Sequence, residues 1–158
     1  MADNTIESRG TELFISVNGT AAIKLTCPTS IGGGGVSANL QEIDCLDAAA
    51  AYDRPTGRKV KPWNVPFIVQ AGDAAHKFVL EQLNTSTLTT QEVPYAIAWS
   101  DGATDPVITA GNFTAPAGRT SIIGKGYITD VTLDHSGGDV LRASLTLTPT
   151  SQTYTAKV

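Results

Sequence analysis

The sequence has little of what exported, membrane-spanning or zinc-binding proteins need. Cys27 and Cys45 are its two cysteines, and its first ten residues, MADNTIESRG, lack the apolar core of an export signal. We therefore predict reduced core thiols rather than a disulfide bridge. No apolar run reaches the length that crosses a bilayer. The two histidines and two cysteines also lack the spacing of a zinc site.

Charged residues are scarce as well, since they make up 16% of the 158 residues, and the net charge is −4. A protein that grips nucleic acid through its phosphates needs an excess of lysine and arginine, so this class is disfavoured. Threonine, serine and glycine fill the gap, and they favour strands and turns over helices. We expect residues 1–158 to form a single domain, with a mobile N-terminal segment of about residues 1–9.

Candidate catalytic and ligand-binding motifs are incomplete. Asp134, His135 and Ser136 are consecutive in a turn, where they cannot aim at one another as a nucleophilic triad does. The run IGGGGV lacks the Gly-Lys-Ser/Thr of a phosphate loop and leads into a strand, so a mobile loop tip is expected. Asp101 and Asp105 flank an Asp-Gly turn without the spacing of a calcium loop. The sequence therefore predicts no enzyme and no cofactor.

Alternating apolar and polar residues predict antiparallel strands along most of the chain. TELFISVNG alternates and ends in an Asn18-Gly19 turn. VSANLQEIDCLD also alternates, but its phase changes at Glu42-Ile43, where we expect a bulge.

One helix is predicted at DAAHKFVLEQLN, residues 73–84. Asp73 suits the N-cap, because its carboxylate can accept hydrogen bonds from free backbone N–H groups. An apolar stripe at helical spacing, formed by Ala75, Phe78, Val79 and Leu83, is expected on the core, whereas His76 is expected at the surface. Several strands, one helix and several more strands predict a mainly β fold. We expect an antiparallel β-sandwich or open barrel flanked by one α-helix.

The most regular stretch, TSIIGKGYITDVTLDHSGGDVLRASLTLTPT at residues 120–150, predicts two long strands joined at residues 135–138. One face of this hairpin is apolar, with Tyr127, Val131, Leu133, Leu141, Ala143, Leu145 and Leu147. The other face is polar, with Asp130, Thr132, Asp134, Arg142, Ser144 and Thr146. Arg142 is expected either to pair with Asp130 or to lie outside the functional part of that face.

The segment from about Ala48 to Trp63 is expected to form a long basic loop. Its cationic members are Arg54, Arg58, Lys59 and Lys61. A nucleic-acid patch would need more positive charge and interleaved aromatic residues. A solvated loop and a contact with an acidic surface on a neighbouring subunit both fit better.

Long strands with a polar outer face and no catalytic site fit a structural or interaction protein better than an enzyme. Unpaired strand edges need protection or a partner. If copies associate side by side, each sheet continues into the next and its edges disappear. A head-to-tail interface of this kind either closes into rings or extends as a helix.

The order of these motifs resembles the major tail tube protein of long-tailed, non-contractile bacteriophages. The resemblance begins with GTELFISVNG and LTCPTSIGGGGVSANLQEIDCLD, continues through the loop and the helix, and ends with GYITDVTLDHSGGDVLRASLTLTPT. It implies a helix-flanked β-sandwich that assembles as six-fold rings, stacked into a hollow tube for DNA ejection. It also implies an initiator at the tail tip, a terminator, a tape measure protein inside the tube, and DNA that passes without specific binding. The implied location is the virion tail, and the host cytoplasm before assembly.

Two groups of residues are given roles by this resemblance. Lumen-facing candidates are polar and poor in cations, so that DNA does not stick. They are Ser37, Asn39, Gln41, Asp130, Thr132, Asp134, Ser144 and Thr146. Inter-subunit contact candidates are the basic residues Arg54, Arg58, Lys59 and Lys61, which would meet Glu42, Asp44 or Asp47 of a neighbour.

Two other functions fit the same sequence. The first is the tube protein of a contractile tail or a related secretion system, which a neighbouring sheath gene would distinguish. The second is a ligand- or carbohydrate-binding β-sandwich, with Trp63, Tyr95, Trp99 and Tyr127 as a stacking platform. Trp99 shares a face with Tyr95 and Ile97, however, which favours core packing.

Overall fold

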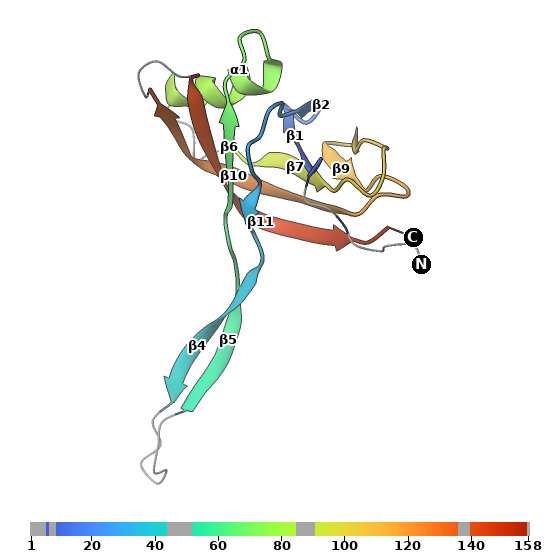
Figure 1. Ribbon diagram of the computed structural model, residues 1–158. Helices are drawn as coiled ribbons and strands as arrows, with labels where there is room; N and C mark the ends of the chain where they lie inside the picture. Colours follow the sequence, from blue (N-terminus) through green and yellow to red (C-terminus); the bar gives the residue numbers. More distant parts are fainter. Residues whose placement is uncertain (1–5, 7–8, 44–51, 85–90, 136–139, 158) are drawn as a thin grey trace.

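The structure is a computed structural model that describes residues 6, 9–43, 52–84, 91–135 and 140–157. It is mainly β and antiparallel, and α1 is the one α-helix among these residues (Figure 1). In chain order the elements are β1 Glu12–Val17, β2 Ala21–Lys24, β3 Gly32–Gly33, β4 Val36–Ile43, β5 Tyr52–Val60, β6 Trp63–Ile68, α1 Ala74–Glu81, the 3₁₀ turn η1 Gln82–Asn84, β7 Val93–Ala98, β8 Val107–Thr109, β9 Asn112–Thr114, β10 Ser121–Asp134 and β11 Arg142–Thr155. The predicted fold class is confirmed.

Seven strands form the principal sheet, in the order β2-β1-β7-β10-β11-β6-β3. The predicted β10–β11 hairpin lies at its centre and is paired from Ser121↔Thr155 to Asp134↔Arg142. β7 pairs with β10 only over residues 121–126, and β6 pairs with β11 only over residues 142–147. The two ends of the hairpin therefore belong to different halves of the sheet.

One buried cluster joins these two halves, as in a β-sandwich. Leu13 of β1 and Ile97 of β7 share it with Val65 of β6 and Leu145 of β11, and Val79 of α1 packs against the same cluster. All five side chains are at most 1% exposed. Burial of this apolar surface is the main force that holds the strands and the helix together.

Two β-bulges interrupt the hairpin, because Thr129 and Thr150 have no residue opposite them. A bulge adds one residue to one strand, which bends the strand and reverses the alternation beyond it. The prediction that Tyr127 lies on the apolar face was wrong for this reason. Tyr127 lies opposite Thr148, and Ile128 is buried in its place.

The N-cap of α1 is Asp73, as predicted. Its carboxylate accepts hydrogen bonds of 2.9 Å from the backbone N–H groups of Ala75 and His76, and one of 2.7 Å from the hydroxyl of Thr26. Burial alone would raise the pKa of Asp73, but these hydrogen bonds outweigh it and hold the pKa below its ordinary value.

The prediction that His76 lies at the surface was wrong, since only 1% of this residue is exposed. Its Nδ1 accepts a hydrogen bond of 2.9 Å from the N–H of Gln70, so its Nε2 carries the hydrogen and donates to the carbonyl of Thr26 at 2.8 Å. The ring also stacks on Phe67, with the ring centroids 4.6 Å apart. Because both ring nitrogens find partners inside, burial costs this imidazole little.

The glycine run, predicted to be a loop tip, instead packs against β6. Gly32 and Gly33 form β3 and pair with Asn64 and Trp63. Gly34 has a φ of 68°, and a Cβ atom there would lie 2.3 Å from the ring of Trp63. Glycine is required at this position because both the backbone conformation and the close approach exclude a side chain.

Within the described residues, most of the predicted basic loop is a strand. β5 pairs with β4 in a separate two-stranded sheet that projects away from the rest of the molecule (Figure 1). We call β4 and β5 together the arm. The bulge predicted at Glu42-Ile43 lies elsewhere, at Thr56 of β5, between the pairs Asn39↔Gly57 and Leu40↔Pro55.

Cys27 is a free thiol, as predicted, but it is exposed rather than buried in the core. It follows β2 with a positive φ of 49°, and its sulfur accepts a hydrogen bond from the side chain of Gln70. Cys45 lies outside the described residues.

Candidate assembly surfaces

The polar face predicted for the β10–β11 hairpin is present. Its members form three cross-strand pairs, which are Asp130↔Thr146, Thr132↔Ser144 and Asp134↔Arg142. The three β10 members are exposed, whereas Ser144 and Thr146 are half-buried because β6 lies beside them. We call these six residues the hairpin polar face.

Register decides how charge is distributed on this face. Arg142 lies opposite Asp134, while Asp130 lies opposite Thr146, two pairs away. Cross-strand neighbours of opposite charge attract, so Arg142 belongs with Asp134 at the end of the hairpin rather than with Asp130. The rest of the face carries hydroxyl groups and the Asp130 carboxylate.

A third strand extends the hairpin polar face, which sequence reasoning missed. Asn64 of β6 is exposed and lies opposite Thr146, and its Oδ1 accepts a hydrogen bond of 2.7 Å from the hydroxyl of Ser144. The signal was available, because Asn64 alternates with the apolar residues Trp63 and Val65. The uncharged polar surface therefore spans β11 and β6.

Two stretches of the hairpin have an unpaired edge within the described part of the chain. β7 pairs with β10 along residues 121–126, and no described strand continues on that edge beside residues 127–134. β6 pairs with β11 along residues 142–147, and no described strand continues on that edge beside residues 148–155. The two stretches are equal in length and lie on opposite sides of one hairpin. An unpaired edge presents free N–H and C=O groups that another strand can bind.

The arm brings together residues that were predicted to have different roles. Ser37 lies opposite Lys59, and Gln41 lies opposite Arg54, so lumen candidates and contact candidates share one face of the arm. Asn39 lies on that face between them. None of the three lies in the principal sheet with the hairpin polar face.

The other face of the arm is apolar near its base and acidic towards its distal end. Four cross-strand pairs define it, which are Val36↔Val60, Ala38↔Arg58, Leu40↔Pro55 and Glu42↔Asp53. Val36 is 46% exposed and Leu40 is 59% exposed. We call this set the apolar arm face. Asp44 and Asp47, the other acidic candidates, lie outside the described residues.

Sequence reasoning also missed a buried cation beside β1 and β7 of the principal sheet. Arg119, just before β10, is 3% exposed. It donates a hydrogen bond of 2.8 Å to Glu12 and one of 3.3 Å to Asp105, and it also donates to the backbone carbonyls of Ala98 and Trp99. These partners are distant in sequence, so no local pattern signals the site.

Glu12 joins this cation to a second one. Its carboxylate contacts the ammonium of Lys24 as well as the guanidinium of Arg119. Burial alone would raise the pKa of Glu12, but the hydrogen bonds and charges of Lys24 and Arg119 outweigh it and hold the pKa below its ordinary value. This network fixes the start of β1.

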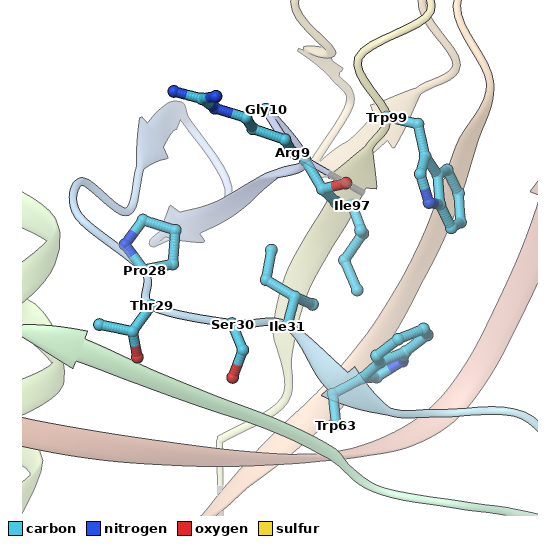
Figure 2. Close-up of a pocket in the computed structure, with 10 residues that line it drawn as sticks. Arg9, Gly10, Pro28, Thr29, Ser30, Ile31, Trp63, Ile97 and Trp99 are labelled. Carbon is cyan, nitrogen blue, oxygen red and sulfur yellow. The ribbon is translucent and has the colours of Figure 1, made fainter. Parts of the chain in front are cut away.

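A cavity of about 560 Å³ lies between the β2–β3 connection and β6 and β7, and Figure 2 shows Trp63, Trp99, Ile31 and Ile97 around it. Trp63 is only 7% exposed, with Gly34 against its ring, and Tyr95 is fully buried. The four aromatic residues considered as a sugar platform are therefore not exposed together on one surface. This arrangement disfavours the carbohydrate-binding alternative.

Metal and membrane sites have no support in the described part of the chain. No group of three histidine, cysteine or acidic side chains there could hold a metal ion. None of the helices formed by these residues is long and apolar enough to cross a bilayer.

Comparisons with known proteins identify one protein family and one shared fold. The family model described as "Phage tail tube, TTP, lambda-like" matches residues 4–158. The SPP1 tail tube protein superposes with a TM-score of 0.69 at 10% identity, covering 98% of this chain and 81% of its own. A chain of the anti-feeding prophage baseplate superposes with a TM-score of 0.66 at 9% identity, covering 99% of this chain and 98% of its own. A chain from the tail of an empty GTA particle superposes with a TM-score of 0.64 at 8% identity, covering 96% of this chain and 100% of its own. Such identities show a shared fold alone, and no curated protein sequence matches.

Proposed function

Because this chain belongs to the lambda-like phage tail tube family, we propose that it polymerises as stacked hexameric rings into the wall of a hollow tail tube. The tube is a conduit for DNA ejection into the host, and the protein is structural rather than enzymatic. Its location is the virion tail, after a period in the host cytoplasm. Residues 1–158 would act as one tail-tube domain, and most of the N-terminal segment of about residues 1–9, which was expected to be mobile, lies outside the described residues.

The observation that carries the proposal is the pair of unpaired edges on the β10–β11 hairpin. One belongs to residues 127–134 and the other to residues 148–155, on opposite sides of the hairpin. A contact that joins different surfaces of identical copies repeats from copy to copy, and it closes into a ring when the rotation allows. Strand addition at these edges makes the sheets of neighbouring copies continuous and removes both edges.

The lumen is lined by the hairpin polar face. Asp130, Thr132, Ser144 and Thr146 offer carboxylate and hydroxyl groups, and Asn64 extends this surface. DNA binds proteins chiefly through lysine and arginine contacts to phosphate, so such a surface lets it slide. Asp134 also lies on the hairpin polar face, and its carboxylate lies opposite Arg142, the one cation of that face.

The predicted lumen role of Ser37, Asn39 and Gln41 fits less well. Lys59 and Arg54 lie opposite Ser37 and Gln41 on the same face of the arm, and two cations beside a channel would hold phosphates. We therefore place the arm at contacts between copies, where Arg54, Arg58, Lys59 and Lys61 were expected. Single exposed ion pairs contribute only about 0–1 kcal/mol, so the stack relies on many repeats.

Further partners follow from this role. An initiator at the tail tip and a terminator would begin and end the tube, and a tape measure protein would occupy it during assembly. Solved relatives include chains from a sheath/tube terminator and a tube-terminating cap, which supports the existence of such end contacts. Genomic DNA would pass through without specific binding, and no membrane is involved.

The tube of a contractile tail is the second candidate. The anti-feeding prophage and an extracellular contractile injection system contain chains of this fold. The family match favours the non-contractile class. A gene for a sheath protein beside the gene for this chain would favour the contractile tail instead.

Negative-stain electron microscopy of the concentrated, purified protein tests the proposal. We expect rings or hollow tubes, either spontaneously or after addition of the tail-tip initiator. Monomers under both conditions would contradict it.

A further inference from the structure

The two β-bulges of the β10–β11 hairpin lie close together, on opposite strands. Thr129 is the extra residue of β10, and Thr150 is the extra residue of β11. The pairs between them are Gly126↔Pro149, Tyr127↔Thr148 and Ile128↔Leu147. We call these pairs and the two threonines the hairpin corner. Pairing with β7 ends at Gly126 and pairing with β6 begins at Leu147, so the hairpin passes from one half of the principal sheet to the other within the corner.

The residues around the corner favour irregular pairing. Pro149 has no N–H group to donate to a ladder, and proline within sheets is confined to edges and bulges. Opposite it, a Cβ atom at Gly126 would lie 2.5 Å from the carbonyl oxygen of Thr148. A Cβ atom at Gly124 would lie 2.1 Å from the carbonyl oxygen of Ser151. Only glycine lets the two strands approach this closely, so the sequence itself encodes the corner.

Hydroxyl groups hold both bulges in place. The hydroxyls of Thr129 and Thr148 share a hydrogen bond of 3.0 Å. The hydroxyl of Thr150 donates to the carbonyl of Lys125 at 3.1 Å and to the carboxylate of Glu92, just before β7. A bulge bends its strand and increases the local twist, and strands that pass between the sheets of a sandwich turn at such bulges. The corner is therefore a fixed bend rather than a loose joint.

The corner also lies between the two unpaired edges. Residues 127–134 extend from it in one direction, and residues 148–155 extend from it in the other. When the first edge of one copy pairs with the second edge of the next, the angle between the edges within a copy becomes the rotation between copies. A repeated rotation closes at six copies only if it is about 60° for each copy, and other rotations give other rings or an open helix.

We propose that the hairpin corner, through the bulges at Thr129 and Thr150, sets the rotation between neighbouring copies and thereby the number of copies in a ring. This inference rests on the proposed tube function and identifies the residues that determine its symmetry. Curved and closed sheets need bulges and glycine kinks at defined positions, which is the pattern of the corner. Without one bulge the hairpin is straighter, and the same edges pair at a different rotation.

Deletion of Thr129 tests the corner without disturbing the core. Ile128↔Leu147 and Asp130↔Thr146 are already consecutive pairs, so the deletion leaves a continuous ladder. Ile128 and Val131 stay on the buried face, and Asp130 stays on the exposed face. The folded variant should still assemble, because both edges remain. It should form rings with a different number of copies or open ribbons, as counted in end-on views by cryo-electron microscopy.

Thr129→Ala is the matched control, because it removes the hydroxyl group but keeps the extra residue. It should form the same rings as the unmodified protein. Deletion of Thr150 removes the other bulge and should also change the ring. Six-fold tubes of unchanged diameter from either deletion variant, or no assembly by a folded deletion variant, would overturn the role of the corner and leave the tube function standing. An unmodified protein that never assembles would overturn both.

The tube of the unmodified protein gives a second readout that needs no variant to fold. In its cryo-electron microscopy structure, Thr129 and Thr150 should still be unpaired, and the hairpin should bend at the corner by the same angle as in the single copy. A hairpin that straightens in the ring, with a regular ladder through both threonines, would refute the proposal.

Discussion

Arg119 and Glu12 are 107 positions apart in the chain, and a hydrogen bond of 2.8 Å joins Nη2 of the arginine to Oε2 of the glutamate. The guanidinium is 3% exposed, and it also donates to the carbonyls of Ala98 and Trp99 at the end of β7. One side chain thus ties the start of β1 to the end of β7 and the approach to β10. The stability of the monomer should depend on it.

Arg119→Met should lower the free energy of unfolding by about 3 kcal/mol, because it leaves buried carbonyls without their donor and removes one of the two cations that Glu12 contacts. Urea denaturation followed by circular dichroism measures this. Lys77→Met is the control, since Lys77 pairs with Glu81 at 3.9 Å on an exposed helix face. Its loss should change stability by no more than about 0.5 kcal/mol. Equal effects of the two substitutions would contradict the role given to Arg119.

Glu12 should make stability depend on acid pH. Its pKa in the folded state lies below the ordinary value of 4.5, because the hydrogen bonds and charges of Lys24 and Arg119 outweigh the opposing effect of burial. The unfolded chain therefore takes up a proton first as the pH falls. The stabilisation is fully present above the ordinary pKa and is lost as the pH falls towards the folded pKa.

The Glu12→Gln variant isolates this contribution from that of other carboxylates such as Asp73. Its unfolding free energy, measured from pH 7 down to pH 3, should decline less steeply than that of the unmodified protein. Parallel pH profiles for the two proteins would show that Glu12 is not held ionised by its neighbours.

Gly34 and Gly35 form a matched pair in which only the surroundings differ. Both have positive φ values, of 68° and 87°, but a Cβ atom at Gly34 would lie 2.3 Å from the Trp63 ring, whereas nothing lies within 4 Å of one at Gly35. Gly35→Ala should cost about 1 kcal/mol from backbone strain. Gly34→Ala should cost about 1–3 kcal/mol more from overpacking and shift the tryptophan fluorescence. Equal losses would contradict the close approach.

Some of these features could be predicted because their signals are local. Asn18 and Gly19 form the expected turn, each with a positive φ. Asp73 caps α1 where the sequence placed a cap. The strict alternation of β11 from Arg142 to Leu147 correctly assigns its two faces. In each case a few adjacent residues contain the whole determinant.

Other features depend on contacts that no local pattern contains. A basic loop was expected from about Ala48 to Trp63, yet the backbone pairs of β4 and β5 make residues 52–60 a strand. The bulge at Thr129 reversed the assignment of Tyr127, because a single unpaired residue changes the phase of a strand. Arg119 is buried by residues up to 107 positions away. Pairing register and burial by distant segments therefore account for the errors.

Lysine at the proposed lumen should obstruct DNA without preventing assembly. Ser144→Lys with Thr146→Lys places two cations on the hairpin polar face, where they would bind passing phosphates. Phage particles whose tubes carry the pair should look normal by electron microscopy but eject DNA more slowly, and added salt should reduce the difference.

Thr109→Lys is the matched control for this experiment, because Thr109 is an exposed threonine on β8, outside the hairpin polar face. It adds positive charge to the same subunit and should leave ejection unchanged. A normal rate of DNA ejection by the Ser144 and Thr146 double variant would show that these residues do not face the lumen.

Cryo-electron microscopy of the assembled protein tests the central claim most directly, since it shows both the symmetry and the surface that lines the channel. The account predicts six copies in each ring, a sheet continuous between neighbours through residues 127–134 and 148–155, and Asp130, Thr132, Ser144 and Thr146 facing the lumen. A tube with another face of the subunit towards the lumen, or an assembly without a central channel, would contradict it.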